Sequence, residues 1–183
     1  MCRLRAGARY RALARLMEEN AGNPEHPELC GAMYDGQGRQ HLGTMYYMVR
    51  LPPDKALKGV PESRPGPGGG NFDMPGYMKI MEDALEARAA RRTVRVALGA
   101  LEACAMPLMR IGDCIFNPQF VTTCMELLDA GEAVLEFNVL NSLAVIVVRA
   151  ENGAGFVAPH RPGEKSIEEY EEHVPLSERG QRG

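Results

Sequence analysis

The residue types that carry out most enzyme chemistry are present in this chain but scattered. Its four histidines contain no H-x-x-x-H pair and its five cysteines contain no C-x-x-C pair, so neither a zinc site nor a disulfide framework is indicated. No G-x-S-x-G motif supplies a hydrolase nucleophile. Cys114 or Cys124 could pair with a distant histidine, but the place of Cys124 on an apolar helix face is typical of an inert core thiol. We predict no catalytic residue, no metal and no cofactor, and keep an enzyme of another type as a third hypothesis.

Arginines gather at the start of the chain. The first 15 residues hold no acid and five arginines: Arg3, Arg5, Arg9, Arg11 and Arg15. Such a cluster suits contact with nucleic-acid phosphates, because each neutralised phosphate releases counterions. The alternative is a solvated helix face on which Arg15 pairs with Glu19, four residues later.

The first elements that would position these residues are a helix and a hairpin. Tyr10, Leu13, Ala14 and Met17 follow the i, i+3, i+4, i+7 spacing of a buried face, which predicts a helix over 8–20. Two β-prone runs on either side of "DGQG" predict a hairpin over 29–51. The proline- and glycine-rich segment 52–75 predicts a flexible insertion or loop, and its "GPGGGNF" lacks the G-K-[ST] ending of a phosphate-binding loop.

The rest of the chain predicts a short helix over 78–91, a strand over 93–97 and either a strand pair or an extended connection within 107–116. Asn117 and Pro118 suit the N-cap and first residue of a helix over 118–130, and Gly131 suits its C-terminal end. Its apolar face would consist of Phe120, Val121, Cys124, Leu127 and Leu128. An alternating strand around 135–139, the apolar run "LAVIVVR" and a short strand in "FVAP" follow. Together these elements predict an α+β fold.

Length and composition set the limits of that fold. A chain of 183 residues with 45% hydrophobic and 25% charged residues suits one domain with a sizeable insertion. No run of about 18 apolar residues indicates a membrane span, and no apolar segment marks a signal peptide. With 11 methionines and five cysteines in no pairing pattern, we expect a cytoplasmic protein. We assign residues 1–162 to one domain and 163–183 to an acidic C-terminal tail.

The segment "FNPQFVTTCMELLDAGEAVLEFNVLNSLAVIVVRAENGAGFVAPHRP" resembles the last domain of bacterial DNA sliding clamps, the β subunit of DNA polymerase III. In that family a strand leads into an F-N-x-x-[YF] helix, strands and a turn follow, and the chain ends near M-P-h-R, where h is apolar. Phe116, Asn117, Phe120 and the Pro159-x-Arg161 ending stand where this pattern places them. More loosely, "RYRALARLMEE" with the following hairpin resembles the first half of such a domain, and "FDMPGYMKI" resembles an F-P-x-Y segment near clamp domain junctions.

The resemblance implies a clamp-like domain of two helices packed on antiparallel sheets, and a homo-oligomeric ring around DNA. The helices would contact the backbone of double-stranded DNA, with Arg9, Arg11 and Arg15 as the candidate residues. It also implies a groove beside the C-terminal strand, where polymerase or repair proteins dock short peptides. The rim of that groove would be formed by Val157, Ala158, Pro159, His160 and Arg161. From the residues alone, the alternative for this segment is a loop that leaves an edge strand.

Two hypotheses about function follow. The first is a non-enzymatic, sliding-clamp-like protein associated with DNA replication, of reduced size as in a phage or mobile element, which holds DNA or docks clamp-binding partners. The second is a protein–protein interaction or regulatory module that keeps the clamp-like fold but neither forms a ring nor binds DNA. Glu126 and Asp129 on the second helix favour the second, because a helix that faces DNA should be basic.

Overall fold

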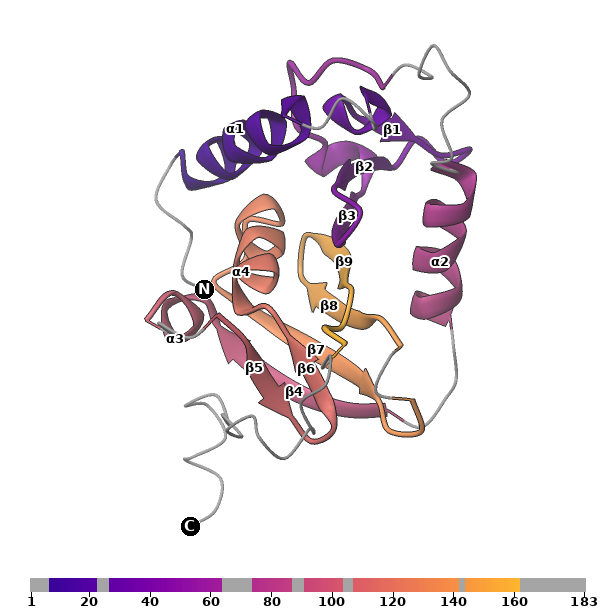
Figure 1. The fold of residues 1–183 in the computed structure, drawn as a ribbon. Coiled ribbons are helices and arrows are strands. Elements are labelled where there is room, and N and C mark those ends of the chain that lie inside the picture. Colours follow the sequence, from indigo (N-terminus) through magenta and orange to yellow (C-terminus); the bar gives the residue numbers. More distant parts are fainter. Residues whose placement is uncertain are drawn as a thin grey trace.

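The computed structural model describes residues 7–22, 27–63, 74–86, 91–103, 107–141 and 144–161. In these residues four α-helices surround a seven-stranded antiparallel sheet of order β1-β2-β3-β9-β8-β7-β4, and β5 and β6 form a separate hairpin (Figure 1). The predicted α+β class is therefore confirmed. The helices are α1 (Ala8–Ala21), α2 (Met74–Glu86), α3 (Leu98–Glu102) and α4 (Pro118–Leu127). The strands are β1 (Met33–Tyr34), β2 (Gln40–Gly43), β3 (Tyr47–Leu51), β4 (Arg91–Ala97), β5 (Met109–Ile111), β6 (Cys114–Phe116), β7 (Glu132–Asn138), β8 (Ile146–Ala150) and β9 (Gly153–Val157).

Two units of the same order build most of the sheet. In the first, α1 is followed by β1, β2 and β3, and in the second α4 is followed by β7, β8 and β9. Their last strands pair antiparallel, with Tyr47 opposite Val157 and Arg50 opposite Ala154, so the two units meet in the middle of the sheet. Between them in sequence come α2, α3, the β5–β6 hairpin, and β4, which extends the sheet by pairing with β7.

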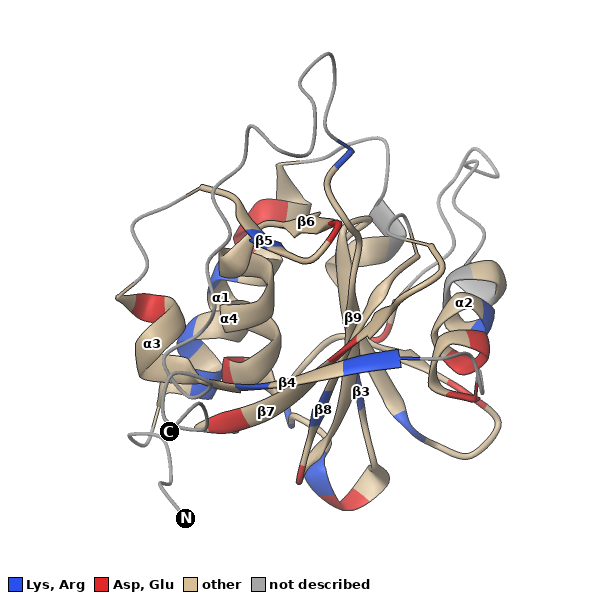
Figure 2. Ribbon diagram, turned by 90° about the horizontal axis from the view of Figure 1, so that it is seen from below, with Lys and Arg blue, Asp and Glu red and all other residues tan. Residues whose placement is uncertain are grey.

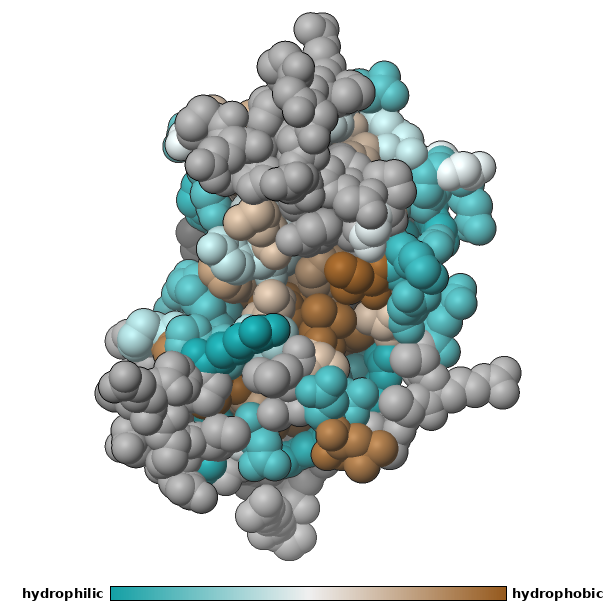
Figure 3. All heavy atoms as spheres, turned by 45° about the vertical axis from the view of Figure 1, so that its right-hand side comes forward, coloured by the Kyte–Doolittle hydropathy of each residue, from teal (hydrophilic) through white to brown (hydrophobic). Residues whose placement is uncertain are grey.

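Alternation along β3 separates the two faces of the sheet. Tyr47 and Val49 belong to the main core, which contains residues of α1 and α4, whereas Met48 between them packs in a smaller core under α2. Figure 1 accordingly shows α1 and α4 on one side of the strands and α2 on the other. Figure 3 turns the α2 side forward and shows hydrophobic residues at its centre with hydrophilic residues around them. The smaller core consists of Met33, Met48, Met81 and Phe156.

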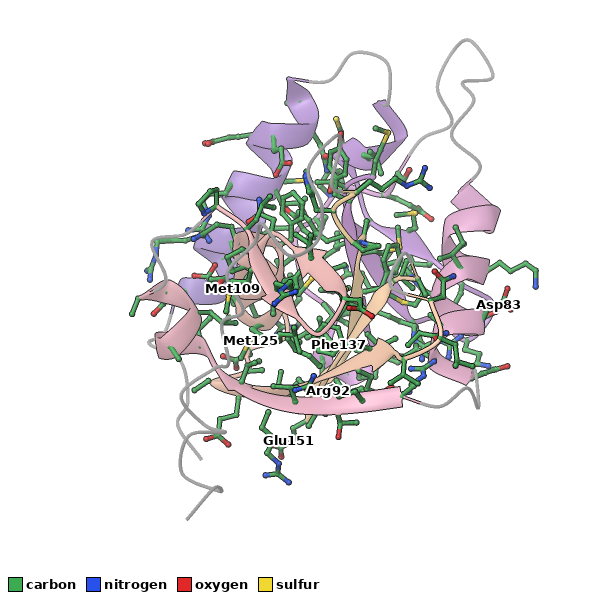
Figure 4. The ribbon with its side chains drawn as sticks, turned by 60° about the horizontal axis from the view of Figure 1, so that its bottom comes forward. Asp83, Arg92, Met109, Met125, Phe137 and Glu151 are labelled. Atoms are coloured by element: carbon green, nitrogen blue, oxygen red, sulfur yellow. The ribbon has the colours of Figure 1, made fainter. Side chains whose placement is uncertain are left out.

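The main core also holds the β5–β6 hairpin in place. Met109 of β5, Met125 of α4 and Phe137 of β7 are buried residues of the main core (Figure 4). The rings of Phe116 and Phe137 lie 5.9 Å apart, which joins β6 to the sheet. In contrast, Asp83 of α2 points outward. Of the two alternatives for 107–116, the strand pair is the one that the structure shows.

The first helix lies close to its predicted bounds, and its buried face is only partly the predicted one. Tyr10, predicted to be buried, is 54% exposed, and the buried positions recur every four residues: Ala8, Ala12, Leu16 and Asn20. The prediction is confirmed for Leu13 and Met17, which are half-buried against the main core, and wrong for Tyr10 and Ala14, because the side of α1 that faces the core is centred on Ala12 and Leu16. The amide of Asn20 is buried because it donates hydrogen bonds to the carbonyl oxygens of Leu29 (2.8 Å) and Gly43 (3.0 Å).

The second predicted helix, α4, starts as expected and ends differently. The side chain of Asn117 accepts a hydrogen bond from the N–H of Gln119 (2.9 Å), which confirms the N-cap. The C-terminal residue is not Gly131: the left-handed position is Asp129, with a φ of 53°. The N–H of Ala130 reaches back to the carbonyl of Met125 (2.9 Å), and the N–H of Asp129 to that of Glu126 (3.0 Å). This pair of bonds closes the helix two residues earlier than a glycine end at 131 would.

Part of the proline- and glycine-rich middle of the chain has regular backbone structure, which its composition does not predict. Within the predicted 52–75 loop, residues 53–55 form one 3₁₀ turn and Leu57 is 3% exposed. The Gln40 side chain accepts from the N–H of Leu57 (2.8 Å) and donates to its carbonyl (3.1 Å), while Ala32 bridges to Glu62. Residues 64–73 and the acidic tail lie outside the described residues. The helix predicted over 78–91 is α2, which begins earlier and ends before β4.

None of the helices in the described part of the chain is long and apolar enough to cross a membrane.

Candidate protein-docking surface

The segment that follows β9 is held by two backbone hydrogen bonds. The N–H of Ala158 donates to the carbonyl of Tyr46 (2.7 Å), and the N–H of His160 donates to the carbonyl of Ile115 in β6 (2.7 Å). Pro159 between them has no N–H. Because both donors are already used, neither Ala158 nor His160 presents an open backbone N–H group.

The five predicted groove residues divide between core and surface. Val157 is fully buried in the main core and takes no part in any rim. Ala158 and Pro159 are half-buried, and His160 and Arg161 are exposed. The structure therefore keeps four of the five at the surface, in one continuous segment.

Two aromatic residues lie next to this segment. The rings of Tyr46 and Phe120 are stacked, with centroids 5.8 Å apart and planes 10° apart, and Tyr47 lies against the inner side of Phe120 at 5.3 Å. Tyr46 remains 52% exposed although it is large and mostly apolar. We call Tyr46, Phe120 and residues 158–161 the docking surface. The sequence pattern identifies Phe120 through its helix but not Tyr46, whose ring partner belongs to the other unit.

The arginines of α1 have different surroundings. Arg9 is half-buried and donates from Nε to the carbonyl of Leu127 (2.7 Å) and from Nη2 to that of Lys55 (2.6 Å). Burial lowers the pKa of Arg9, against the opposing effect of Asp129. Arg11 is exposed on the surface of α1. The structure thus assigns Arg9 to the C-terminal end of α4 and leaves Arg11 facing solvent.

Arg15 makes its ion pair with Glu126 of α4 rather than with Glu19. The Arg15 side chain is 56% exposed and that of Glu126 is 10% exposed, so the pair lies at the edge of the α1–α4 contact. Glu19 instead accepts a hydrogen bond from the hydroxyl of Tyr47 (3.3 Å). Glu126, whose negative charge counts against contact of α4 with DNA, is therefore paired with Arg15, which is itself a candidate for contact with DNA.

The described residues give little support to thiol or metal chemistry. Burial raises the pKa of the Cys114 thiol to about 12 and also raises that of Cys124, so both thiols are protonated at neutral pH. Within the described ranges, no group of three or more histidine, cysteine, aspartate or glutamate residues could hold a metal ion.

Comparisons of the chain with protein-family models, with curated proteins and with solved structures find no match. The resemblance to sliding clamps therefore remains a hypothesis. What the geometry adds to it is local: the "FNPQF" run places Asn117 as the cap of α4 and Phe120 beneath Tyr46.

Proposed function

We propose that this chain is a non-enzymatic docking domain that binds a short peptide on the docking surface. The observation that carries the proposal is the half-exposed Tyr46 stacked on Phe120, next to a chain segment fixed by two hydrogen bonds. Tyrosine is enriched where interfaces concentrate their binding energy, because its ring buries a large area and its hydroxyl keeps a polar contact. A pre-formed aromatic surface also avoids the entropy cost of ordering a loop on binding.

The expected peptide is apolar with an acidic residue beside its anchor. An aromatic or leucine side chain would lie on the Tyr46–Phe120 pair, and a carboxylate would meet the exposed Arg161. In keeping with the sliding-clamp resemblance, we propose polymerase or repair proteins of DNA replication as the source of such peptides. The domain would act by bringing them together, without chemistry of its own.

The test is fluorescence polarisation with labelled ten-residue peptides that carry a Leu-Phe pair flanked by acidic residues. Tyr46→Ser should weaken binding at least about tenfold, since an interface tyrosine typically contributes about 2 kcal/mol. Tyr10→Ser is the matched control, because Tyr10 is 54% exposed and Tyr46 is 52% exposed. Equal affinities for the two variants would contradict the assignment of the surface.

A second candidate function is contact with the backbone of double-stranded DNA through α1. It is favoured by the exposure of Arg11 and of Arg15, which is 56% exposed even within its ion pair. If Arg11 contacts a phosphate, Arg11→Gln should weaken binding to every DNA sequence similarly and lower the slope of log K against log salt by about one. Size-exclusion chromatography with light scattering would separate the predicted homo-oligomeric ring from a monomer. A monomer without salt-sensitive binding would exclude the ring hypothesis.

A further inference from the structure

The sheet face under α2 carries a charged cluster that neither proposed function uses. The strand register places His41 opposite Arg50, Arg50 opposite Ala154, and Ala154 opposite Arg149, in one row across four strands. Residues opposite one another point to the same face, and neighbouring strands are about 4.8 Å apart, so the Cα atoms of Arg50 and Arg149 are about 10 Å apart. In this row Ala154, whose side chain is a methyl group, lies between them. Figure 2 shows Lys or Arg residues on both β3 and β8, the strands on either side of β9.

The carboxylates near one end of this row are already occupied. Asp35 accepts from Nε of Arg39 (2.6 Å) and from Nε2 of His41 (2.9 Å). Glu82 of α2 accepts from Nη2 of the same Arg39 (2.9 Å). His41 is 1% exposed in its side chain and is held by Asp35 within the protein. Two acids and one arginine therefore form a closed group at the β1–β2 turn.

The carboxylate at the other end is occupied as well. Glu136 pairs with Arg91 (2.5 Å) and with Arg149. The same two arginines donate to the last carbonyl groups of α2, Arg91 to Ala84 and Arg149 to Leu85 (2.9 Å). Helix ends leave such carbonyls without intrahelical partners and carry partial negative charge, so these contacts fix the C-terminal end of α2 on the sheet.

Arg50 is the arginine that remains between these two groups. Among the described residues, no carboxylate lies within ion-pair distance of its guanidinium and no acceptor takes a hydrogen bond from it. Burial lowers the pKa of Arg50, and so does the positive charge of Arg39, while Asp35 and Glu82 act on it only from a distance. The paired groups balance three carboxylates with three guanidinium groups, so Arg50 leaves the cluster with one positive charge in excess.

We propose that Arg50 is the centre of a binding site for an oxyanion, namely a phosphate or carboxylate group of a ligand, with Arg39 and Arg149 at its sides. A guanidinium with unused donors takes such a group through two parallel hydrogen bonds. Arg50 has lost part of its hydration on folding without gaining a hydrogen bond or ion pair from the described residues, and an anion would restore that loss. The site needs no residue of the docking surface and no residue of α1.

Inorganic phosphate is the probe, and thermal unfolding of the full chain at constant ionic strength is the first measurement. Phosphate should raise the melting temperature of the wild type and of Arg11→Met, a control from the opposite side of the sheet, but not that of Arg50→Met. In phosphate-free buffer Arg50→Met should be at least as stable as the wild type, because it removes a half-buried charge without a counter-ion. Equal stabilisation of Arg50→Met by phosphate would overturn the proposal, and so would a loss of stability in this variant without phosphate.

A phosphate titration followed by NMR gives the affinity and the source of the natural anion. Arg50→Met should weaken phosphate binding at least about tenfold, the effect of one charge-assisted contact, and Arg50→Lys should recover only part of it. A second full-chain variant changes four tail glutamates to glutamine: Glu168, Glu169, Glu171 and Glu172. If this variant binds phosphate several-fold more tightly than the wild type, the tail carboxylates compete with phosphate and are the source of the anion. If it binds phosphate equally well, the ligand comes from outside the chain. An unchanged affinity in Arg50→Met would rule out the site for either source.

Discussion

Arg9 and Arg11 lie two residues apart on α1, and the sequence predicts a DNA-facing role for both, yet their surroundings differ. Arg9→Met removes the donors and keeps most of the apolar stem. The bond from Arg9 to the carbonyl of Leu127 satisfies a helix end and places a cation at its negative pole. A hydrogen bond to a charged group contributes about 1.5–3 kcal/mol when buried. Because Arg9 is half-buried and its bond to Lys55 is exposed, we expect a total loss of about 2 kcal/mol.

The measurement is equilibrium unfolding in urea, with thermal unfolding as a second readout. A loss of about 2 kcal/mol corresponds to a decrease in melting temperature of about 4–8 °C for a chain of this length. Arg11→Met, on the exposed surface of the same helix, should change stability by less than about 0.5 kcal/mol. Equal stabilities of the two variants would refute the view that Arg9 fixes α1 to α4. Unfolding with an unchanged m-value would confirm that the loss comes from the folded state.

Two further predictions concern buried polar groups. Asn20→Asp should lower the free energy of unfolding by at least about 3 kcal/mol, because a carboxylate would replace an amide that donates to the carbonyls of Leu29 and Gly43. Urea unfolding measures this loss, and a midpoint equal to that of the wild type would contradict it. Burial lowers the pKa of His41, although its hydrogen bond to Asp35 opposes this, so the unfolded chain binds the proton more readily than the folded one. Stability should therefore decrease as the pH falls below about 6.5, by up to about 1.4 kcal/mol per pH unit for this group. His41→Gln should flatten that part of the stability–pH curve, and an unchanged curve would show that His41 does not titrate as inferred.

The parts of the fold that the sequence predicts well are those with local physical causes. Asn117 and Pro118 fix the start of α4 through a side-chain hydrogen bond and a ring-restricted φ, both within three residues. The alternation in β7 follows from one buried and one open side of a strand. These signals do not depend on what the element packs against, so the chain alone contains them.

The face of α1 and the end of α4 could not be read in the same way. The apolar spacing of α1 predicts Tyr10 and Met17 on one buried face, but the core lies on the side centred on Ala12, so Met17 is half-buried and Tyr10 is exposed. Asp129 takes the left-handed position although Gly131 is available two residues later. The end of α4 also has contacts from outside the helix, because Arg9 donates to the carbonyl of Leu127 and Asn152 donates to that of Asp129.

The docking surface shows the same limit. The pattern of "FVAPHRP" correctly predicts that residues 159–161 lie at the surface. The pattern does not find Tyr46, because the ring on which Tyr46 stacks is supplied by the distant helix α4. The prediction that Val157 lies on a groove rim was wrong for a related reason. Val157 lies opposite Tyr47 in a central strand and faces the main core.

The arginines of this protein illustrate why composition alone is a weak guide to nucleic-acid binding. Arg9 contacts the last carbonyl of α4, while Arg91 and Arg149 contact the last carbonyls of α2, so three arginines fix helix ends to the rest of the fold. Arg11 and Arg50 do not share that task, and they lie on opposite sides of the sheet. A variant at Arg11 therefore reports on DNA contact and a variant at Arg50 on anion binding, and neither should disturb the other measurement. The two sites are independent. If the variant at one arginine loses its binding while the variant at the other does not, the first arginine binds a ligand and the second serves only solubility.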